Sequence, residues 1–522
     1  MSPPLHERLM ELAISRGFLL PSAEIYQAPG GFYDYGPAGA AIKRHIQERW
    51  RQLFITEPGF LEIESCTVLP QPVLVASGHV EHFADPVCEC TKCKQRFRAD
   101  HLLEQKTMQS WAGKQPVELN EGLLANQIKC PACKGDLGVV GWANLMFPTS
   151  IGAGGDNPAY LRPETAQGIF LDFKRLFVQQ GSKLPLAVGQ IGRSYRNEVS
   201  PRQGLIRQRE FTQMELEYFF NPAQDKMDGF EKIKGETVRI LPPADGDTPL
   251  AEQDIRLADA LQQGYFPNEI LAYMIHLEDR LYASLGIPKN KYRFRVMPRD
   301  ELPHYSKGNV DLEVQTSYGW IETSGIAYRT DFDLSQHAKH SKKDMNVTVV
   351  AESAAASEPG KPAPAPPTTR LVPHVVEPSM GVDRTFWCVL ESAYRPAGEG
   401  KEWEWFAFPP AVAPYVAGVF PLMRKDGLEE IAQELLTALR AAGLEVYYAS
   451  SGSIGKRYAR ADEIGVPYGI TIDYETKEKA NEPGGPTVTV RFRDDGAQER
   501  VKISEVPVLL AKWAKAGKVR KG

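Results

Sequence analysis

Two stretches near the N-terminus place apolar residues on one side of a helix. In ERLMELAISRGF and in AAIKRHIQERWRQLF the apolar residues recur with a helical period, which predicts two helices, the second over residues 38–54. The stretch between them, GGFYDYGPAG, is a glycine-rich aromatic turn. FLEIESCTVL follows the second helix and is rich in β-branched and apolar residues, so it predicts a strand.

The central part of the chain mixes strand and helix patterns. Apolar runs broken by turns fill residues 141–220, and residues 308–334 alternate polar and apolar positions as strands do. Residues 221–300 are charged and predict mostly helix, as in EILAYMIHLEDRLYASLG, and another helix pattern covers 383–394. The Ala/Pro/Ser tract 351–369 offers too little apolar surface to order itself, so we expect a flexible surface insertion there.

From about residue 404 onward, strands and helices alternate as in a compact α/β domain. LEEIAQELLTALRAAG predicts a helix, whereas LEVYYAS, YGITID and TVTVRFR predict strands. Residues 405–423 carry no charge over 19 positions, which is close to the length of a membrane span. Because this stretch contains four prolines, a spanning helix would be broken and its backbone groups left unpaired in lipid. We therefore interpret it as buried strand and loop and expect no membrane association.

The composition is that of an ordinary globular protein. Hydrophobic residues make up 42% and charged residues 24% of the 522 positions, and the net charge is −5. This charge excludes a strong overall basic field, so any nucleic-acid surface must be a local patch. The length predicts about three or four domains, and the N-terminal residues show no long apolar core of the kind that a secretory signal has.

Five of the seven cysteines fall in one window, in the segments CECTKC and CPAC. Two C-x2-C pairs provide four thiolates with the spacing of a tetrahedral structural zinc site: Cys90, Cys93, Cys130 and Cys133. Cys88 is a spare fifth cysteine, and His79 or His82 could replace a ligand. A thiol-redox interpretation of CPAC leaves the other C-x2-C pair unexplained. The pattern indicates metal binding in a reducing compartment rather than disulfides.

The segment SYRNEVSPRQGLIRQREFTQMELEYFF, residues 194–220, predicts a strand, a polar turn and a returning strand. Arg196 and Glu198 are two positions apart and are expected on one strand face, while Phe211, Gln213 and Glu215 alternate onto one face of the returning strand. Such a set of side chains could bind a polyphosphate, stack on a base and hold an amine. The alternative is a surface hairpin with cross-strand ion pairs.

This hairpin resembles motif 2 of the class II aminoacyl-tRNA synthetases, and the segment EPSMGVDR at 377–384 resembles motif 3. The segments GGFYDYGPAGAAIK, SGHVEHFADP, FRADHL, YLRPETAQGIF, GWIETSGIAYRTDFDL and IGKRYARADEIGVPYGITID resemble the homodimeric glycyl-tRNA synthetase family. The resemblance implies an α+β fold with an antiparallel-sheet catalytic domain, an inserted zinc module and a C-terminal α/β anticodon-binding domain.

The same resemblance implies a domain order. Residues 1–85 would form the N-terminal part of the catalytic domain with motif 1 and the dimer interface, and residues 86–140 the zinc module. Residues 141–403 would carry motifs 2 and 3, with the helical insertion near 221–300, and residues 404–522 would bind the anticodon. In that tail Lys456, Arg457 and Arg460 are the expected contacts to the tRNA backbone.

Residue roles in ATP binding follow from the matched motifs. The resemblance assigns Arg196 to the α-phosphate and the glycine carboxylate, Arg207 and Arg384 to the γ-phosphate, and Phe211 to adenine stacking. These three arginines are the expected catalytic residues. The full expected ATP site is Arg196, Asn197, Glu198, Ile206, Arg207, Phe211, Glu322, Thr323, Gly381 and Arg384, with Glu322 as a ligand of the Mg²⁺ that accompanies ATP.

The expected glycine site must recognise an ammonium group and exclude bulk, because glycine has no side chain. The resemblance assigns Arg98, Glu164, Phe211, Gln213, Glu215, Glu377, Ser379 and Gly381 to it. Acidic groups that converge on one small amine suit this task.

The implied activity is that of a cytoplasmic, homodimeric glycine–tRNA ligase. It would activate glycine with ATP and transfer it to the 3′ end of tRNA(Gly), and because the attacking carboxylate is already ionised, positioning and charge neutralisation would suffice for activation. A non-catalytic relative that binds nucleic acid would be expected to lack the three arginines. A metal-dependent hydrolase would need an open position on the metal, which four cysteine ligands do not leave.

Overall fold

The computed structural model describes residues 3–27, 30–111, 113–199, 201, 203–244, 250–299, 301–302, 306–350, 368–398, 400–479 and 485–520. The flexible insertion expected at 351–369 therefore lies almost entirely outside the described residues. Within these ranges no helix has both the length and the apolar character needed to cross a membrane.

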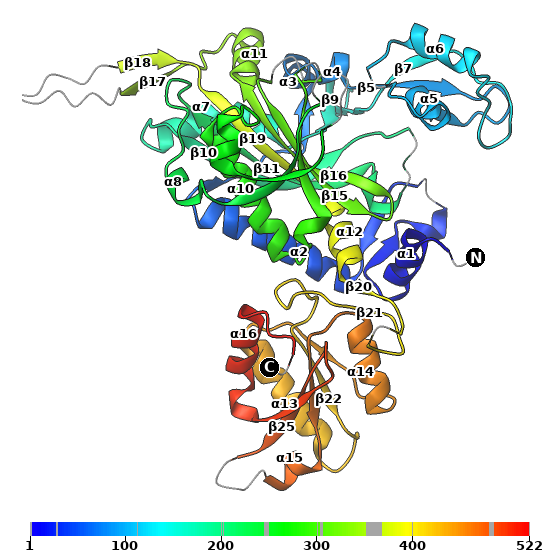
Figure 1. The fold of residues 1–522 in the computed structure, drawn as a ribbon, viewed down its shortest axis with the longest axis vertical. Coiled ribbons are helices and arrows are strands. Elements are labelled where there is room, and N and C mark those ends of the chain that lie inside the picture. The colour runs from blue at the N-terminus through cyan, green and yellow to red at the C-terminus, as the bar shows by residue number, and fades with distance from the viewer. Residues whose placement is uncertain are drawn as a thin grey trace, which may run out of the picture.

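A nine-stranded, mostly antiparallel sheet forms the centre of the upper body in Figure 1. Its strands follow the order β13-β12-β14-β15-β16-β19-β11-β10-β3. Their bounds are β3 Leu61–Glu62, β10 Leu186–Tyr195, β11 Glu210–Phe220, β12 Thr237–Leu241, β13 Gln253–Arg256, β14 Tyr292–Val296, β15 Asn309–Thr316, β16 Gly319–Thr330 and β19 His374–Gly381. Among the three longest strands of the sheet, β11 and β16 flank β19, and β10 lies beyond β11. This region carries the site described below.

Helices cover both faces of this sheet. The main core joins the sheet to helices that include α1 Leu5–Ser15, α2 Pro37–Arg51, α10 Glu269–Ser284 and α12 Val382–Ala393. A second core joins the opposite face to α7 Ala166–Gln179 and α11 Phe332–Ser341. The strand β11 shows why two cores form: Met214 and Leu216 belong to the first and Phe219 to the second, because alternate strand residues face opposite ways.

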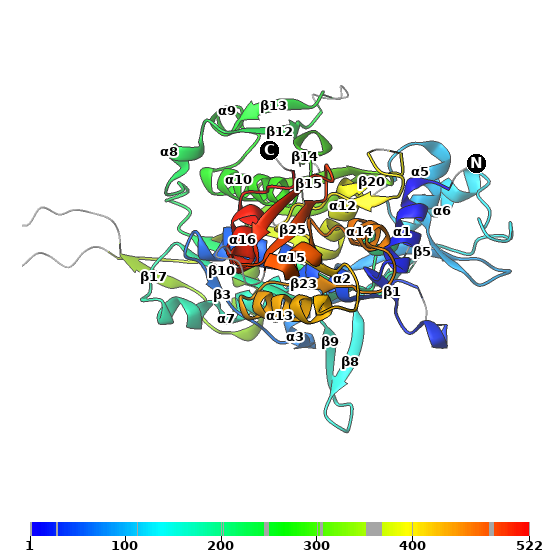
Figure 2. The ribbon, with the colours of Figure 1, turned by 90° about the horizontal axis from the view of Figure 1, so that it is seen from below.

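The segment expected to be one strand after the second helix is instead two short strands. β3 pairs in parallel with β10, whereas β4 Val68–Pro70 pairs with β9 Asn157–Leu161 in a separate sheet of order β4-β9-β8. The hairpin of β8 Phe147–Ile151 and β9 projects from the body at the lower edge of Figure 2. The helices α3 Gln71–Ala76 and α4 His79–His82 follow β4.

Residues 221–300 contain more strand than the sequence pattern predicted. Besides α10 they form the short helices α8 Phe230–Ile233 and α9 Leu257–Gln262, together with the three strands at one end of the large sheet. This end of the sheet is partly exposed, so its strands carry charged residues. These residues hid the strand pattern in the sequence. Two small hairpins complete the upper body: β1 Leu19–Pro21 with β2 Tyr33–Tyr35, and β17 Val347–Val350 with β18 Thr368–Leu371.

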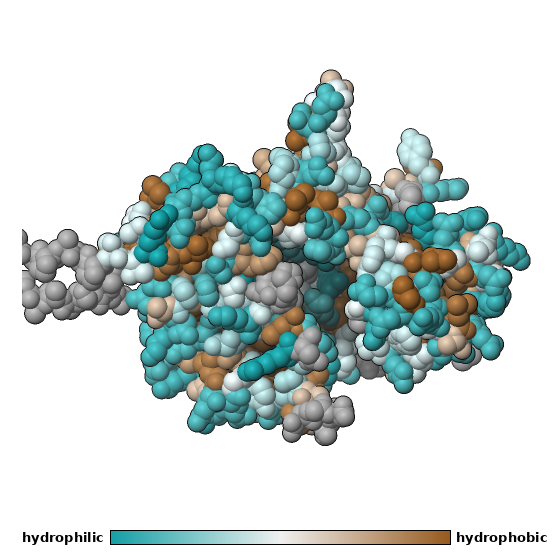
Figure 3. Space-filling view, turned by 90° about the horizontal axis from the view of Figure 1, so that it is seen from above, coloured by the Kyte–Doolittle hydropathy of each residue, from teal (hydrophilic) through white to brown (hydrophobic). Residues whose placement is uncertain are grey.

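The cysteine-rich insertion forms a separate lobe at the upper right of Figure 1. Its sheet has the order β6-β5-β7 and is flanked by two helices: β5 Ala84–Glu89, β6 Arg96–Arg98, β7 Gly141–Asn144, α5 Ala99–Thr107 and α6 Pro116–Ala125. The lobe has its own small apolar core. Seen from above, the surface is hollowed between this lobe and the main body (Figure 3).

The C-terminal body lies below the sheet body in Figure 1 and is an α/β structure, as its sequence pattern predicted. Its sheet has the order β23-β22-β24-β25-β26. The elements are β22 Ala417–Pro421, α13 Leu428–Ala441, β23 Val446–Tyr448, α14 Ile454–Glu463, β24 Tyr468–Ile472, α15 Tyr474–Glu478, β25 Thr487–Phe492, β26 Gln498–Lys502 and α16 Val506–Lys515. The uncharged stretch 405–423 is buried strand and loop here, including β21 Trp405–Phe406, which pairs with β20 Tyr394–Arg395.

The two bodies share apolar core. Phe406 and Phe408 pack on Phe18, at ring distances of 5.2 and 6.1 Å, so the C-terminal body closes part of the main core. The ion pair Arg16–Glu463, at 3.0 Å, lies across the same contact.

Candidate active site

The predicted hairpin 194–220 forms the floor of the site. β10 and β11 pair antiparallel, and the neighbouring strand β19 places Ser379 opposite Glu215 and Gly381 opposite Gln213. Phe211, Gln213 and Glu215 thus share one face of β11, as the alternation predicted, and motif 3 lies beside them through strand register.

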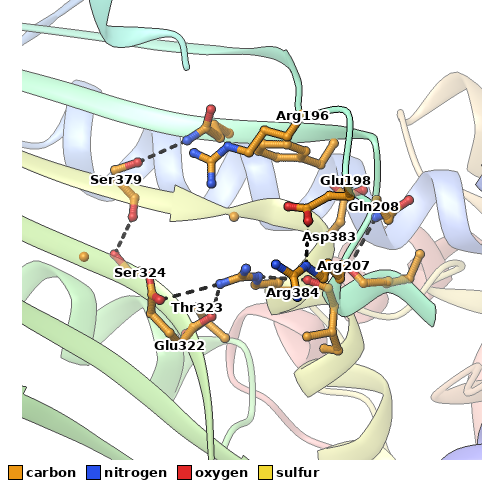
Figure 4. Close-up of a pocket in the computed structure, with 16 residues that line it drawn as sticks. Arg196, Glu198, Arg207, Gln208, Glu322, Thr323, Ser324, Ser379, Asp383 and Arg384 are labelled. Carbon is orange, nitrogen blue, oxygen red and sulfur yellow. Dashed lines mark hydrogen bonds and ion pairs between the residues drawn. The ribbon is translucent and has the colours of Figure 1, made fainter. Parts of the chain in front are cut away.

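A cavity of about 210 Å³ opens above these strands (Figure 4). Most of the predicted ATP-site residues line it, together with four of the eight predicted glycine-site residues, of which Phe211 and Gly381 belong to both sets. The predicted residues in the lining are Arg196, Glu198, Ile206, Arg207, Phe211, Gln213, Glu322, Thr323, Ser379, Gly381 and Arg384. The lining also includes five residues that the sequence analysis did not select: Leu205, Gln208, Ser324, Gly325 and Asp383.

Three arginines make one end of the cavity basic. Arg196 was predicted to lie on a strand but follows the end of β10. Its guanidinium is 5.1 Å from the ring centroid of Phe211. Arg207 donates to Glu198 at 2.7 Å and lies 3.6 Å from Asp85 of the cysteine-rich lobe. Glu198 therefore faces the same cavity as Arg196, although neither belongs to a strand.

The third arginine is held by backbone oxygens. Arg384 donates to the carbonyl oxygens of Ile206 and Glu322, at 3.0 and 2.7 Å, and lies 3.9 Å from the Glu322 carboxylate. Its side chain is 35% exposed, so it can reach a ligand in the cavity. Two cationic side chains from different motifs thus converge with Arg196 on one space, an arrangement suited to a polyphosphate.

Buried carboxylates stand behind the wall at the other end of the cavity, called the acidic end below. Glu215 accepts hydrogen bonds from Ser379 Oγ at 2.6 Å, from Gln213 Nε2 at 2.8 Å and from the backbone N–H of Thr165 at 2.8 Å. Burial and the charge of Glu164 nevertheless raise the pKa of Glu215. A positive charge placed beside this carboxylate would stabilise its ionised form.

Glu377 belongs to the same acidic group but pairs with an arginine. Its carboxylate lies 2.6 Å from Arg329, which also pairs with Asp333 at 2.8 Å. Burial raises the pKa of Glu377 to about 8, against the effect of Arg329. Arg329 was not among the predicted site residues, although it lies in the segment GIAYRT that carried part of the family resemblance.

Glu217 continues the acidic face of β11 and was also missed. Neither of its carboxylate oxygens has a hydrogen-bond partner among the described residues, and its side chain is fully buried. Burial and the nearby Glu377 raise its pKa well above the usual range. The alternation that led to Glu215 also reaches Glu217, two residues on, so the signal was present in the sequence.

Five predicted residues lie outside the cavity lining: Arg98, Glu164, Asn197, Glu215 and Glu377. Glu215 stands directly behind Gln213 and Ser379, which do line it. Glu164 faces a second cavity of about 600 Å³ with His79 and Arg329, and it accepts a hydrogen bond from Gln167 at 2.8 Å.

Arg98 lies outside the cavity lining, and its expected contact with the substrate stays a prediction. It pairs with Asp85 at 2.9 Å and with Asp100 at 3.0 Å, and so it reaches the cavity only through the contact of Asp85 with Arg207. A side chain already engaged by two carboxylates within its own lobe has fewer free donors for a ligand.

The four predicted cysteines come together in the inserted lobe. The Sγ atoms of Cys90, Cys93, Cys130 and Cys133 all lie within 4.8 Å of one another. Two Sγ pairs are 3.5 and 3.6 Å apart, close to the ~3.8 Å that four ligands at the usual zinc–sulfur distance would show. The donor set fits a tetrahedral zinc ion.

Both cysteine pairs sit in the same type of turn. The N–H of Lys94 donates to the Cys90 carbonyl and that of Lys134 to the Cys130 carbonyl, and both lysines have a φ of 60°. Cys88 instead points into the lobe, where its Sγ lies 3.6 Å from the Phe97 carbonyl and burial raises its pKa to about 11. It therefore lies outside the cluster.

One prediction for the C-terminal body is wrong. Arg457 is 3% exposed and donates to the backbone carbonyls of Pro421, Leu422 and Ala449, so it ties α14 to the sheet and cannot contact a nucleic-acid backbone. Lys456 and Arg460 are exposed and lie one helical turn apart on α14.

Two protein families match parts of the chain. Residues 153–242 match the family described as tRNA synthetase class II core domain (G, H, P, S and T), and residues 416–513 match the family described as anticodon binding domain. These ranges contain the β10–β11 hairpin and the C-terminal sheet, respectively.

Relatives of known name cover almost the whole chain. The glycine–tRNA ligase of Methanothermobacter thermautotrophicus is 40% identical over 97% of this chain and 98% of its own length, and that of Pyrococcus abyssi is 40% identical over 96% and 97%. In fold the chain resembles prolyl-tRNA synthetase from Cryptosporidium parvum complexed with L-proline and AMP, with a TM-score of 0.55 and 13% identity, over 98% of this chain and 76% of that one.

Proposed function

The chain belongs to the glycine–tRNA ligase family, and from this premise we propose how its cavity holds the two small substrates. A glycine–tRNA ligase activates glycine with ATP to glycyl-adenylate and transfers the glycine to the 3′ end of tRNA(Gly), so the chain is an aminoacyl-tRNA ligase. The proposal concerns which residues carry out that reaction here.

ATP occupies the basic end of the cavity. Arg196 contacts the α-phosphate and the glycine carboxylate, Arg207 and Arg384 contact the γ-phosphate, and Phe211 stacks on adenine. The convergence of these three arginines, from two sequence motifs, on one cavity is the observation that carries this assignment. Asn197, Glu198, Ile206, Thr323 and Gly381 complete the nucleotide site.

Glu322 is the proposed ligand of the Mg²⁺ that accompanies ATP. Its side chain lies at the cavity wall beside Arg384 and is 57% exposed. An exposed carboxylate can supply an oxygen ligand to a hard divalent cation without a large loss of its own hydration.

Glycine occupies the junction with the acidic end. Its ammonium is bound by Glu215, Glu377 and Ser379, with Gln213 and Gly381 at the wall, and the hydrogen bonds to Glu215 fix the carboxylate before glycine arrives. Glu164 lies behind this wall and acts on the ammonium through its negative charge. Arg98 contributes indirectly, through Asp85.

Activation needs no proton transfer by the protein. The glycine carboxylate is already ionised, so the chain contributes orientation and the neutralisation of phosphate charge. The three arginines supply that charge, and the buried carboxylates hold the amine end of the nucleophile in place.

The four cysteines of the inserted lobe hold a structural zinc ion. Bound zinc would join the two turns that carry Cys90–Cys93 and Cys130–Cys133, with no position left open for catalysis. All seven cysteines are unpaired, which supports a reducing compartment, and we place the enzyme in the cytoplasm. As a homodimer it would use the 38–54 helix region as its interface.

Replacement of Arg196 tests the site. Arg196→Ala should lower glycine-dependent pyrophosphate–ATP exchange about 10²–10³-fold, the typical cost of one lost charge-stabilising donor. The matched control is Arg193→Ala, because Arg193 lies exposed near the end of β10, three residues before Arg196, and its ion pair with Glu210 is long, at 3.6 Å. Exchange near the wild-type rate from a folded Arg196→Ala protein would refute the assignment.

The C-terminal body is proposed to read the anticodon. The double variant Lys456→Ala/Arg460→Ala should reduce tRNA charging about tenfold, whereas exchange, which needs no tRNA, should be unchanged. Lys512→Ala on α16 is the control. Equal loss of exchange and charging would contradict this division of labour.

A further inference from the structure

Asp383 is a buried carboxylate that accepts hydrogen bonds from residues of three elements, β2, α2 and β11. It lies in the first turn of α12, directly before Arg384, and is 2% exposed although it reaches the cavity wall. It accepts hydrogen bonds from the ammonium of Lys43 at 2.8 Å, from the hydroxyl of Tyr35 and from the backbone N–H of Thr212 at 2.6 Å.

Lys43 is itself buried, with 8% exposure. It comes from α2, and Tyr35 comes from β2, so both belong to the N-terminal segment GGFYDYGPAGAAIK. The ammonium of Lys43 lies 4.2 Å from the Tyr35 ring centroid, and that ring packs edge-on against Phe386 of α12 at 5.0 Å. Lys43, Tyr35 and α12 therefore form one packed unit.

The glycines of this segment explain how Lys43 reaches that far inward. A Cβ at Gly36 would collide with the carbonyl oxygen of Gly17, and one at Gly39 with the carbonyl oxygen of Phe18. Only glycine lets the start of α2 approach the preceding loop so closely. Pro37 at the first helical position fixes the direction of the helix.

The unit is connected to both parts of the proposed nucleotide site. Asp383 is covalently adjacent to Arg384, the proposed γ-phosphate ligand, and it binds the N–H that follows Phe211, the proposed adenine platform. A shift of its carboxylate would therefore move both groups that hold ATP.

We propose that Lys43 and Tyr35 are positioning residues for the ATP end of the cavity and act through Asp383. The proposal rests on the proposed roles of Arg384 and Phe211. Neither Lys43 nor Tyr35 lines the cavity, so their effect is on the placement and charge of groups that do.

The charge of Lys43 is a second reason to expect that its loss weakens ATP binding. Although burial opposes ionisation, Lys43 lowers the pKa of Asp383, so a carboxylate anion stands at the cavity wall. Without Lys43 that anion would repel a triphosphate. Lys43 thus both fixes Asp383 and neutralises it.

Lys43→Met tests this directly. In the full-length enzyme we expect KM for ATP in glycine-dependent exchange to rise about 10- to 100-fold, the scale of a small misplacement near the reacting groups. KM for glycine should stay unchanged, because Glu215 and Ser379 are held by other partners. Lys43→Arg should restore most of the ATP affinity, and Tyr35→Phe should raise KM for ATP severalfold.

The chain offers a matched control in Lys401. Its ammonium lies 2.7 Å from buried Asp462 and 4.1 Å from the Trp405 ring, nearly the geometry of Lys43, but in the C-terminal body. Lys401→Met should lower thermal stability comparably and leave KM for ATP unchanged. If Lys401→Met and Lys43→Met change KM for ATP equally, the role of Lys43 is only structural and the proposal is overturned.

A second variant covers the case in which Lys43→Met does not fold. Lys43→Met/Asp383→Asn removes the uncompensated charge while an amide oxygen can still accept the Thr212 N–H, so it should fold and bind ATP better than Lys43→Met alone. Failure of this rescue counts against the proposal.

Arg384→Ala separates failure of this proposal from failure of the proposed function. If Arg384→Ala keeps full exchange, the nucleotide assignment itself is wrong. If Arg384→Ala loses exchange while Lys43→Met keeps a wild-type KM for ATP, only the positioning role fails.

Discussion

The arginines that line one end of the central cavity and the carboxylates behind the wall at its other end are held in opposite ways. At the basic end Arg207 and Arg384 have side chains 24% and 35% exposed; Arg384 rests on backbone carbonyls, and Arg207 on the carboxylates of Glu198 and Asp85. At the acidic end Glu215 and Glu377 are 1% and 4% exposed and are fixed by a dense set of hydrogen bonds and ion pairs.

The difference shows which end can adapt. Partly exposed arginines exchange one partner for another at smaller cost than buried groups do, because water can solvate the guanidinium during the exchange. Buried carboxylates cannot, since leaving a buried charge unpaired is costly. The basic end can therefore rearrange around a large flexible triphosphate, while the acidic end is preformed for a small ammonium.

Removal of a basic-end arginine should produce the largest change. Arg384→Ala is expected to reduce exchange about 10²–10³-fold through the loss of one phosphate contact, without loss of stability. Calorimetry should show weaker ATP binding and unchanged glycine binding. A reduction in glycine binding alone would mean that the two ends are assigned in reverse.

Neutralisation of an acidic-end carboxylate should come next in size. Glu215→Gln keeps the shape but loses the charge, and we expect KM for glycine to rise about 10- to 100-fold with KM for ATP unchanged. Glu210→Gln, on the exposed start of the same strand, is the control. If Glu215→Gln leaves KM for glycine at the wild-type value, the ammonium is bound elsewhere.

Glycine binding at the acidic end should respond to pH near neutrality. Burial and mutual repulsion raise the pKa of Glu215, and that of Glu377 to about 8, so the free pocket retains protons at neutral pH. Bound ammonium favours the ionised carboxylates and displaces protons. KM for glycine should therefore fall, up to about tenfold, between about pH 7 and pH 8.5. A rise over this range would contradict the assignment.

Removal of the metal should change only ATP binding at the basic end, and this should be the smallest of the expected effects. The cysteine-rich lobe touches the cavity through Asp85, which pairs with Arg207. Chelation should release one zinc ion per chain, measured by elemental analysis, and raise KM for ATP a fewfold with KM for glycine unchanged. Cys88→Ser should keep its zinc, because Cys88 lies outside the cluster. Freshly purified protein without zinc would refute the metal site.

Much of the site was predictable because its signals are local. Alternation along 210–220 placed Phe211, Gln213 and Glu215 on one face, and the C-x2-C spacing selected the four clustered cysteines over Cys88. Both are properties of a few neighbouring residues: a strand repeats every second residue, and a tight turn brings two cysteines together whatever surrounds it.

Contacts between segments far apart in the sequence decided the placements that the sequence analysis did not predict. The charge pattern of IGKRYARADE could not distinguish Arg457 from Lys456, yet helix orientation against the sheet buries Arg457 on three carbonyl oxygens. The substrate contact expected for Arg98 stays a prediction, but its two carboxylate partners were also absent from the local sequence signal. The strand end at Tyr195 likewise depends on where β11 stops pairing.

The sequence by itself determined the family, most element types and most residues of the cavity wall, because motifs and periodicities are properties of short stretches of chain. The tertiary structure alone decided which charges neutralise one another. Lys43 and Asp383 are 340 residues apart, and Arg329 and Glu377 are 48 apart, so no local pattern connects them. Such pairs depend on strand register and helix packing, which bring together segments that the chain order keeps far apart.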